Sequence, residues 1–316
     1  MRPDLQEVQK IGNLIEASQR ILIISHRSPD GDTVGSALAL YHILKGQGKS
    51  PELYCIDGMP SEFNFLPNIR EYKQTELTLD YDAYISVDVG ATHLTGLHES
   101  HPELFNKSLP LINIDHHYSN DYFGQYNVVM PTVASATMVV YYMAEMLNYT
   151  IDRVAATALL TGIYTDTGSF MHSNTSAEVL RVAAKLLSKG ADRHSISKEI
   201  FNTTKISTMH LWGRVLKNTH QTPDGVTMSV ITKKDFEETG ADYSEMTGAV
   251  DYVNSVPNSK YSVILTERDG KVKGSLRTLQ DDVNVAEIAS KYGGAATSKQ
   301  RDSLFLVAWN KRCAGK

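Results

Sequence analysis

The chain has 316 residues and a formal net charge of −5, and it is 41% hydrophobic and 21% charged. This balance is typical of a globular protein with room for two domains, and it excludes the large basic surface that long duplex nucleic acid requires. No apolar run reaches about 18 residues, so we predict no transmembrane helix, and the polar start predicts no secretory signal. The two cysteines are too distant in sequence for a disulfide framework or a zinc knuckle, so we expect a protein of the reducing cytoplasm.

The first half of the chain alternates predicted helices with short apolar strands. Helices are expected over residues 4–18, 37–44, 133–147, 153–165 and 177–187, and strands over residues 21–24, 51–56, 81–90 and 109–114. This alternation predicts the α/β class, with a doubly wound parallel sheet in an N-terminal domain of residues 1–190. Such a sheet gathers its ligand-binding loops at the carboxyl ends of its strands.

The segment after the first predicted strand contains the pattern His26-x3-Asp30-x-Asp32. Pro29 stiffens this loop, and Gly31 permits a sharp turn between the two acids. Two carboxylates so close together repel each other, and a cation is their natural counter-charge. The alternative is that one aspartate only caps the following helix, which would require neither the second acid nor His26.

Acidic residues follow three further predicted elements. Asp88 ends one strand, Asp115-His116-His117 follow another, and Asp166 ends a helix, where its charge opposes the helix dipole. Because neighbouring side chains on an extended chain alternate faces, one histidine could bind a metal while the other faces a substrate. The alternative is a polar strand end with solvated histidines.

A parallel sheet would bring six of these side chains together at one edge: His26, Asp30, Asp32, Asp88, His116 and Asp166. Oxygen donors with imidazole favour manganese or magnesium, and the absence of thiolates argues against structural zinc. With one shared carboxylate, the set would fill two metal positions about 3.5–4 Å apart, the arrangement used for phosphoryl transfer to water.

The second half predicts a helical linker over residues 191–217 and a smaller α+β domain over residues 218–316. Strands are expected over residues 225–231, 260–266 and 271–277, with a turn at Asp269-Gly270 and a helix over 283–292. Arg277 ends a strand and is either a surface arginine or a fork for a phosphate. Beyond residue 295 we expect no final strand pair, only an apolar run over 303–309.

These motifs resemble the DHH phosphoesterase superfamily, and the second half resembles its DHHA1 companion domain. The residues that carry the resemblance are His26-x3-Asp30-x-Asp32, Asp88, Asp115-His116-His117 and Asp166. Ser275-Leu276-Arg277 and the chain length most resemble the branch of bifunctional oligoribonucleases and 3′-phosphoadenosine 5′-phosphate phosphatases.

The resemblance implies two Mn²⁺ ions, with Mg²⁺ or Co²⁺ as alternatives, and a hydroxide activated by both metals that attacks phosphorus in line. The implied ligands are His26, Asp30 and Asp88 for one ion, and Asp32, Asp88, His116 and Asp166 for the other, so that Asp88 bridges. His117 would face the scissile phosphate as a charge stabiliser or proton donor, and Asp115 would orient a neighbouring histidine. Arg277, with Ser275, Gly293 and Gly294, would contact substrate across an interdomain cleft.

The implied activity is a manganese-dependent phosphoesterase that cleaves very short oligoribonucleotides to mononucleotides, or removes the 3′-phosphate of a nucleoside 3′,5′-bisphosphate. Expected partners are therefore short single-stranded RNA or a nucleoside bisphosphate, without long duplex nucleic acid or membrane, and a homodimer is left open. Alternatives within the superfamily are an inorganic pyrophosphatase or exopolyphosphatase and a cyclic or linear dinucleotide phosphodiesterase. A pyrophosphate site would require several basic side chains, where the sequence offers chiefly Arg277. The alternative from another class is a nucleotide-binding module without turnover.

The tail departs from the family pattern, because the G-G-G-H segment and its histidine are absent. From Gly293 the chain reads Gly-Gly-Ala-Ala-Thr-Ser-Lys-Gln-Arg-Asp-Ser. We hypothesise a frameshift. Suppose that the gene once encoded Gly-Gly-Gly-Gly-His-Lys-Gln-Ala-Ala-Gly-Phe-Thr: deletion of one G from the third glycine codon would then produce the sequence seen here. The alternative is genuine divergence. A frameshift would remove a phosphate contact of about 1.5–3 kcal/mol and weaken activity on nucleotides.

Overall fold

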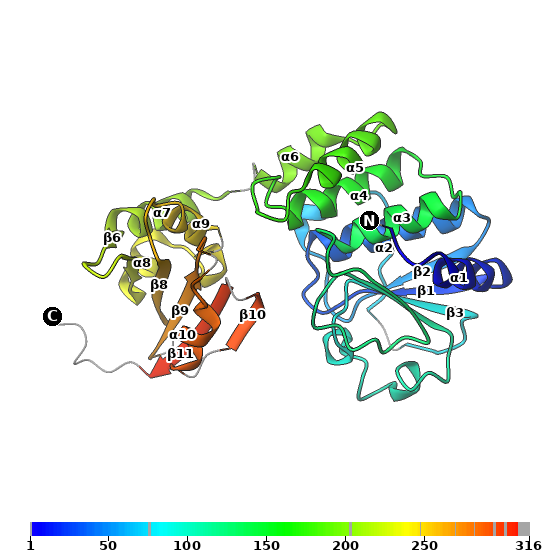
Figure 1. Ribbon diagram of the computed structural model, residues 1–316, viewed down its shortest axis with the longest axis horizontal. Coiled ribbons are helices and arrows are strands. Elements are labelled where there is room, and N and C mark those ends of the chain that lie inside the picture. The colour runs from blue at the N-terminus through cyan, green and yellow to red at the C-terminus, as the bar shows by residue number, and fades with distance from the viewer. Residues whose placement is uncertain are drawn as a thin grey trace. The chain divides into compact units, whose positions relative to one another are not determined.

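The computed structural model describes residues 2–74, 77–201, 204–246, 248–268, 270–280, 282–292, 295–299 and 302–308. The chain forms two compact units, Met1–Thr203 and Thr204–Lys316 (Figure 1). The predicted linker of residues 191–217 is divided between them, since α6 (Arg193–Phe201) belongs to the first unit and α7 (Ile206–Asn218) to the second. No helix among the described residues combines the length and apolar character needed to cross a bilayer.

A parallel sheet forms the centre of the first unit. Its described strands lie in the order β2 (Ser50–Tyr54), β1 (Arg20–Ile24), β3 (Ala83–Val87), β4 (Leu111–Asp115) and β5 (Tyr126–Val129). The chain progresses in opposite directions on the two sides of the boundary between β1 and β3, so this boundary is the switch point at which ligands bind in such sheets. The predicted α/β class is confirmed. The edge strand β5 was missed because its four residues are too few to show a pattern.

The described helices of this unit are α1 (Leu5–Ala17), α2 (Gly31–Gly46), α3 (Ala136–Met146), α4 (Arg153–Asp166), α5 (Ala177–Ser188) and α6. Alternate residues of each strand point to opposite faces of the sheet and pack into two separate apolar cores. Ile21 and Ile23 pack in the core that contains α1 to α5, and Figure 1 shows α2, α3 and α4 over that face of the sheet. Leu22 and Ile24 pack on the opposite face, against loops and 3₁₀ turns. The described 3₁₀ turns are η1 (Ser61–Phe63), η2 (Ile69–Glu71), η3 (Thr92–Thr95), η4 (Pro102–Leu104) and, in the second unit, η5 (Tyr243–Met246).

Helix α2 begins at Gly31, six residues before the predicted start at residue 37. Asp30 is its N-cap, and one oxygen of its carboxylate accepts hydrogen bonds from the backbone N–H groups of Asp32 and Thr33, each at 3.0 Å. Asp30 therefore caps the helix, and it also lies in a candidate ligand group with His26 and Asp88. Asp32 lies in the first helical turn, where its carboxylate is held by the helix instead of a loop.

Two glycines let α2 and α4 approach closely. A Cβ added to Gly35 would lie 2.5 Å from the carbonyl oxygen of Ala158, and one added to Gly162 would lie 2.6 Å from Oδ1 of Asp32. We predict that Gly162→Ala lowers the free energy of unfolding by about 1–3 kcal/mol, because the added methyl group would displace the side chains of Thr137 and Asp32, which are hydrogen-bonded to each other. Urea unfolding measures this change. Gly46→Ala is the control, since nothing lies within 4 Å of its added Cβ; equal stability of both variants would contradict the packing argument.

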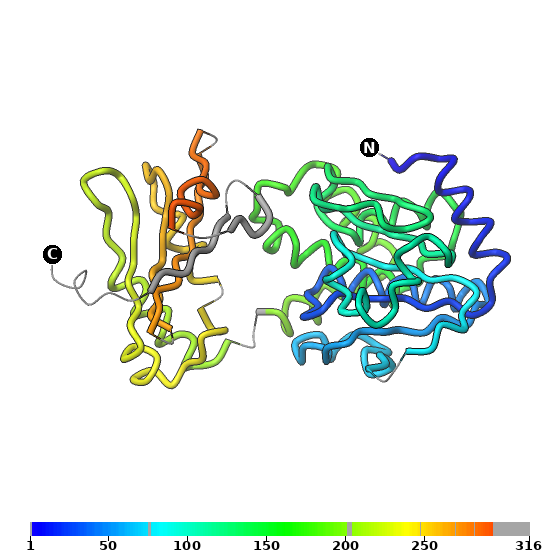
Figure 2. Tube along the Cα trace, turned by 90° about the horizontal axis from the view of Figure 1, so that it is seen from below, coloured from blue at the N-terminus to red at the C-terminus, as the bar shows by residue number. Residues whose placement is uncertain are grey.

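The second unit contains a mixed sheet, and Figure 2 follows the chain of this unit from green through orange. Its described strands lie in the order β10 (Ala295–Lys299), β11 (Asp302–Ala308), β9 (Lys271–Arg277), β8 (Tyr261–Arg268), β7 (Val226–Ile231) and β6 (His220–Gln221). Only the pairing of β7 with β8 is parallel among these strands. The described helices are α7, α8 (Lys233–Thr239), α9 (Ala249–Asn254) and α10 (Val285–Ser290). Ile264 packs with α7, α8 and α9, and Val263 packs with α10, so the two faces of β8 have separate cores.

The expectation that the tail has no final strand pair is wrong. Strands β10 and β11 pair antiparallel, and β11 also pairs along β9, from Asp302 opposite Arg277 to Ala308 opposite Lys271. The physical reason is that the edge of β9 offers backbone donors and acceptors to an extended segment, and backbone pairing depends little on side-chain identity. The short helices α8 and α9 were also not predicted from the sequence.

Candidate metal and active site

The carboxyl ends of β1, β3 and β4 meet at the switch point and carry the predicted site. Three overlapping groups have ligand atoms within 4.8 Å of one another: His26, Asp30 and Asp88; Asp32, His116 and Asp166; and Asp88, His116 and His117. The structure thus brings together the six residues that the sequence nominated as metal ligands, with His117 beside them. Asp88 is shared by two of the groups.

Asp88 has two features that mark a functional residue. It directly follows β3 with a φ of 57°, a left-handed conformation that costs free energy for a residue other than glycine. Its side chain is 3% exposed; Oδ2 accepts a 2.6 Å hydrogen bond from the Thr33 hydroxyl, whereas Oδ1 has no hydrogen-bond partner among the described residues. Burial and the charge of Asp32 raise the pKa of Asp88 to about 6. A buried carboxylate oxygen without a donor is costly, and a cation would compensate it.

The carboxylate of Asp32 is completely buried and lies at the N-terminus of α3. Oδ1 accepts hydrogen bonds from the backbone N–H and the hydroxyl of Thr137, at 3.0 and 2.8 Å, and Oδ2 accepts one from the N–H of Ala136 at 2.5 Å. The helix dipole favours this negative charge. Burial and the charge of Asp30 nevertheless raise the pKa of Asp32 to about 7. Nothing in the sequence pattern indicates Thr137, because its role depends on the contact between α3 and Asp32.

His116 is surrounded by three carboxylates. Its Nε2 lies 3.7 Å from Oδ2 of Asp32, 3.7 Å from Oδ1 of Asp88 and 3.5 Å from Oδ2 of Asp166. Burial lowers the pKa of His116, which favours the neutral imidazole that metals bind. Asp166 is the last residue of α4, where its charge opposes the helix dipole, so a cation at this point would offset an unfavourable interaction.

His26 presents one ring nitrogen to the same cluster. Its Nδ1–H donates a 2.6 Å hydrogen bond to the carbonyl oxygen of Arg27, which directs Nε2 toward the Thr33 hydroxyl and Oδ2 of Asp88, 3.6 Å away. Burial alone would lower the pKa of His26, but the Asp88 carboxylate outweighs it and raises the pKa to about 9. Fixing Nδ1 by a carbonyl is the usual way in which a protein orients Nε2 toward a metal.

His117 is oriented differently from His116. Its Nδ1–H donates a 2.8 Å hydrogen bond to Oδ1 of Asp115, and its side chain is 39% exposed. This hydrogen bond raises the pKa of His117 to about 9. Although burial opposes it, the hydrogen bonds from His117 and Asn120 lower the pKa of the fully buried Asp115. Both shifts favour an imidazolium paired with a carboxylate. No motif in the sequence pointed to Asn120.

The donor set fits a hard divalent cation. Carboxylate oxygens and imidazole nitrogens surround Asp88. Burial, together with the charge of a neighbouring aspartate, raises the pKa values of Asp32 and Asp88, and a cation would offset both effects. The buried thiol of Cys55 instead donates to the carbonyl oxygen of His26 at 3.2 Å, and Cys313 lies outside the described residues.

The predicted substrate contacts lie in the second unit. Arg277, at the end of β9, places Nη1 3.1 Å from Oδ1 of Asp251 in α9, and the two side chains are 33% and 49% exposed. Ser275 lies in the same strand, opposite Ile264 of β8. Gly293 and Gly294 lie outside the described residues. Contact of these four residues with a substrate stays a prediction.

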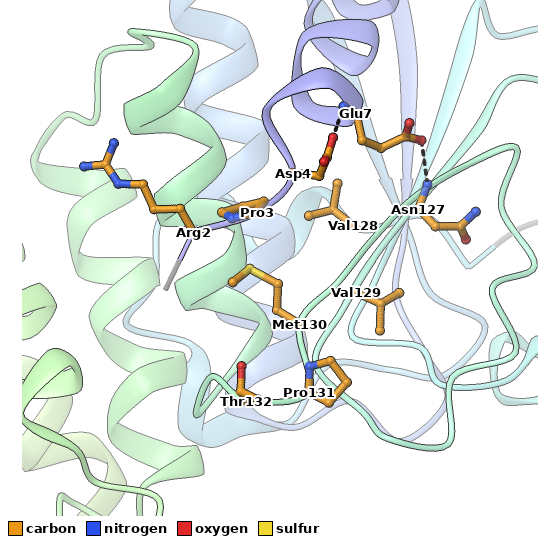
Figure 3. Close-up of a pocket in the computed structure, with 10 residues that line it drawn as sticks. All are labelled: Arg2, Pro3, Asp4, Glu7, Asn127, Val128, Val129, Met130, Pro131 and Thr132. Atoms are coloured by element: carbon orange, nitrogen blue, oxygen red, sulfur yellow. Dashed lines mark hydrogen bonds between the residues drawn. The ribbon is translucent and has the colours of Figure 1, made fainter.

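A cavity of about 270 Å³ lies between the N-terminal segment and edge strand β5 (Figure 3). It is lined by Arg2, Pro3, Asp4, Glu7, Asn127, Val128, Val129, Met130, Pro131 and Thr132, and includes none of the predicted site residues. Figure 3 shows Glu7 accepting a hydrogen bond from the backbone N–H of Asn127, at 3.3 Å. We interpret this hollow as a feature of the covered sheet edge, because that bond occupies a backbone donor of an edge strand.

Residues 20–163 match the family described as "DHH family, N-terminal domain". The bifunctional oligoribonuclease and PAP phosphatase NrnA of Thermus thermophilus is 35% identical over 280 residues, which cover 87% of this chain and 80% of the relative. This chain belongs to the DHH phosphoesterase family. Membership explains why the clustered acids and histidines come from loops so far apart in sequence, and it makes the chain a hydrolytic phosphoesterase that uses divalent metal.

Other similar proteins match the DHH phosphoesterase over nearly its whole length. The NrnA of Mycoplasma genitalium is 28% identical over 297 residues, covering 93% of this chain and 91% of that protein. The crystal structure of an exopolyphosphatase-related protein from Bacteroides fragilis superposes with a TM-score of 0.88, covering 99% and 94% of the two chains at 24% identity. That likeness shows the shared fold, including the second sheet.

Proposed function

We propose that this DHH phosphoesterase cleaves very short oligoribonucleotides to mononucleotides and removes the 3′-phosphate of nucleoside 3′,5′-bisphosphates. The observation that carries the proposal is the buried Asp88 carboxylate. Its Oδ1 has no hydrogen-bond partner among the described residues and lies 3.7 Å from Nε2 of His116 and 3.6 Å from Nδ1 of His117. The names of the NrnA relatives, which describe oligoribonuclease and PAP phosphatase activity, support the substrate class.

The proposed cofactor is a pair of Mn²⁺ ions, with Mg²⁺ or Co²⁺ as alternatives. The residues that would hold them are His26, Asp30 and Asp88 for one ion and Asp32, Asp88, His116 and Asp166 for the other. When bound, such a pair lowers the pKa of water and offsets the charge of the phosphate. The chain supplies the pre-set ligands: Thr33 holds Oδ2 of Asp88, and the N-terminus of α3 holds Asp32.

The proposed role of His117 is to donate a proton to the leaving group. As a water-derived oxygen bonds to phosphorus, the P–O3′ bond breaks and its electron pair stays on O3′. The Nδ1–H of His117 is engaged by Asp115, so the proton given to O3′ comes from Nε2. A pKa of about 9 keeps that proton in place at neutral pH.

Metal should stabilise the protein more at pH 7.5 than at pH 6. The pKa values of Asp32 and Asp88 are raised to about 7 and 6 in the folded protein, so without metal the free energy of unfolding falls as pH rises from about 4 to 7. The pKa of His26 is raised to about 9, so this residue lowers the free energy of unfolding further as pH rises from about 6.5 to 9. A cation replaces these protons. At about 100 times Kd, Mn²⁺ adds roughly 2.7 kcal/mol, or about 5–10 °C in Tm. Differential scanning fluorimetry checks this; an equal or larger gain at pH 6 would contradict it.

The direct test of the proposed substrate class compares four substrates side by side in Mn²⁺: a nucleoside 3′,5′-bisphosphate, an end-labelled trinucleotide, inorganic pyrophosphate and a cyclic dinucleotide. Phosphate release and the product ladder are measured. We expect turnover of the bisphosphate and the trinucleotide. Turnover confined to pyrophosphate or to the cyclic dinucleotide would replace the proposal by that alternative, and nucleotide binding without turnover in saturating Mn²⁺ would indicate a binding module.

A further inference from the structure

One buried amide, that of Asn120, uses its full hydrogen-bonding capacity beside the proposed proton donor. Its side chain is 7% exposed. Nδ2 donates to Oδ2 of Asp115 at 2.6 Å and to the carbonyl oxygen of Val89 at 3.0 Å. Oδ1 accepts from Nδ2 of Asn113 at 2.9 Å and from the backbone N–H of Tyr122 at 2.7 Å. An asparagine amide has two donors and two acceptor positions, and here all four are occupied.

The consequence for Asp115 is a carboxylate whose two oxygens have different fixed partners. Oδ1 accepts from His117 and Oδ2 accepts from Asn120, at 2.8 and 2.6 Å. Since Asp115 is fully buried, water does not compete for either oxygen. Rotation of this carboxylate away from His117 would break the bond to Asn120, so the amide fixes the direction of the imidazole.

The same amide connects two strand ends of the site. Val89 directly follows Asp88 at the end of β3, and Asp115 ends β4. The Nδ2 group bonds to both segments, and the Oδ1 group secures the turn at Tyr122 that follows His117. Backbone hydrogen bonds, such as the one from the Asp88 N–H to the carbonyl oxygen of Ile114, also join these strand ends. Asn120 adds a buried side-chain contact between Val89 and Asp115, the carboxylate that holds His117, and it bonds to none of the proposed metal ligands.

We propose that Asn120 is a positioning residue for proton donation, acting through Asp115 to hold Nε2 of His117 toward the leaving oxygen. This inference rests on the proposed function of His117. It assigns to Asn120 an effect on the step in which the P–O3′ bond breaks, and no effect on metal or substrate binding. The loss of activity on changing Asn120 must then depend on the leaving group of the substrate. A purely structural role of Asn120 would produce the same loss for every leaving group.

The experiment compares two substrates that share one nucleotide: a diribonucleotide, whose leaving oxygen requires a proton, and the p-nitrophenyl ester of the same nucleoside 5′-phosphate, whose p-nitrophenolate leaves without one. We expect Asn120→Ala to lower kcat on the diribonucleotide by about 10–100-fold, as is usual for a group that supports a catalytic residue. We expect kcat on the ester, KM and the Kd for Mn²⁺ to stay at wild-type values. Asn120→Leu has a similar size but no donor to Asp115, and should show the same selective loss with a smaller cavity.

Asn127→Ala is the matched control, since this β5 asparagine bonds to the same loop at Gly124 but does not contact Asp115. It should process both substrates like the wild type. A parallel loss on both substrates in the Asn120 variants, or no loss on either, would overturn the inference. His117→Ala is measured in the same assay. If it also fails to distinguish the two leaving groups, the proposed role of His117 is wrong; if it distinguishes them and the Asn120 variants do not, only the role of Asn120 is wrong.

Discussion

Asp88→Asn should reduce hydrolysis of every substrate to background, a loss of at least about 10⁴-fold, because enzymes of this kind accelerate hydrolysis by about 10⁶-fold or more and the change disables both metal positions at once. Asp88, like His116, belongs to two of the candidate ligand groups, and its Oδ1 has no hydrogen-bond partner among the described residues. The asparagine keeps the size of the side chain but removes its charge. Product formation by chromatography and Mn²⁺ binding by calorimetry should both be lost.

Asp82→Asn is the matched control for this variant. Asp82 lies at the opposite end of the same strand, where its carboxylate accepts hydrogen bonds from the backbone N–H groups of Gln19 and Arg20. Turnover and Mn²⁺ binding should therefore stay at wild-type values. Near-normal turnover in Asp88→Asn would remove this residue from the reaction and with it the assignment of both ions.

His117→Ala should lower kcat by about 10²–10⁴-fold, the usual contribution of a general acid. The Mn²⁺ affinity should change little, because Nδ1 of His117 is engaged by Asp115 and the side chain is 39% exposed. His116→Ala should instead weaken Mn²⁺ binding, because its Nε2 faces three carboxylates. Steady-state kinetics with calorimetry separate the two histidines.

His98→Ala is the control for the loss of an imidazole. His98 has the same exposed fraction as His117, 39%, but its ring pairs with Glu99. The variant should keep wild-type kinetics. A result in which His117→Ala loses Mn²⁺ binding as severely as His116→Ala would show that His117 is a metal ligand and not a proton donor.

The alternation of helices and apolar strands was sufficient to predict the parallel sheet, and acids at strand ends were sufficient to predict which loops converge. This works because the carboxyl ends of parallel strands share one edge, so a strand-end position in sequence implies a position in space. Asp88 and His116 could be placed in this way. The left-handed backbone conformation of Asp88 could not be predicted, because the surrounding structure imposes it and the local sequence does not reveal it.

The supporting residues could not be predicted, because their roles arise from tertiary contacts. Thr137 becomes relevant only when the N-terminus of α3 meets Asp32, and Asn120 only when β3 and β4 lie side by side. The early start of α2 was missed because its first turn is made of polar and small residues, which read as a loop until Asp30 is seen to cap it. The β10–β11 pair was missed because backbone pairing with β9 leaves little trace in composition.

The origin of the tail is a separate question from its pairing. The pairing of β11 with β9 is compatible with either a frameshift or genuine divergence, since strand hydrogen bonds are made by the backbone. Sequencing the gene decides between them. An in-frame sequence with no close allele that restores the family's histidine would end the frameshift hypothesis.

The most direct test of the two-ion site is a crystal structure of the protein grown with Mn²⁺, with anomalous diffraction recorded at the manganese edge. Two anomalous peaks about 3.5–4 Å apart are predicted, with Asp88 contacting both, His26 on one side and His116 on the other. A single peak, or manganese bound elsewhere in the chain, would contradict the account.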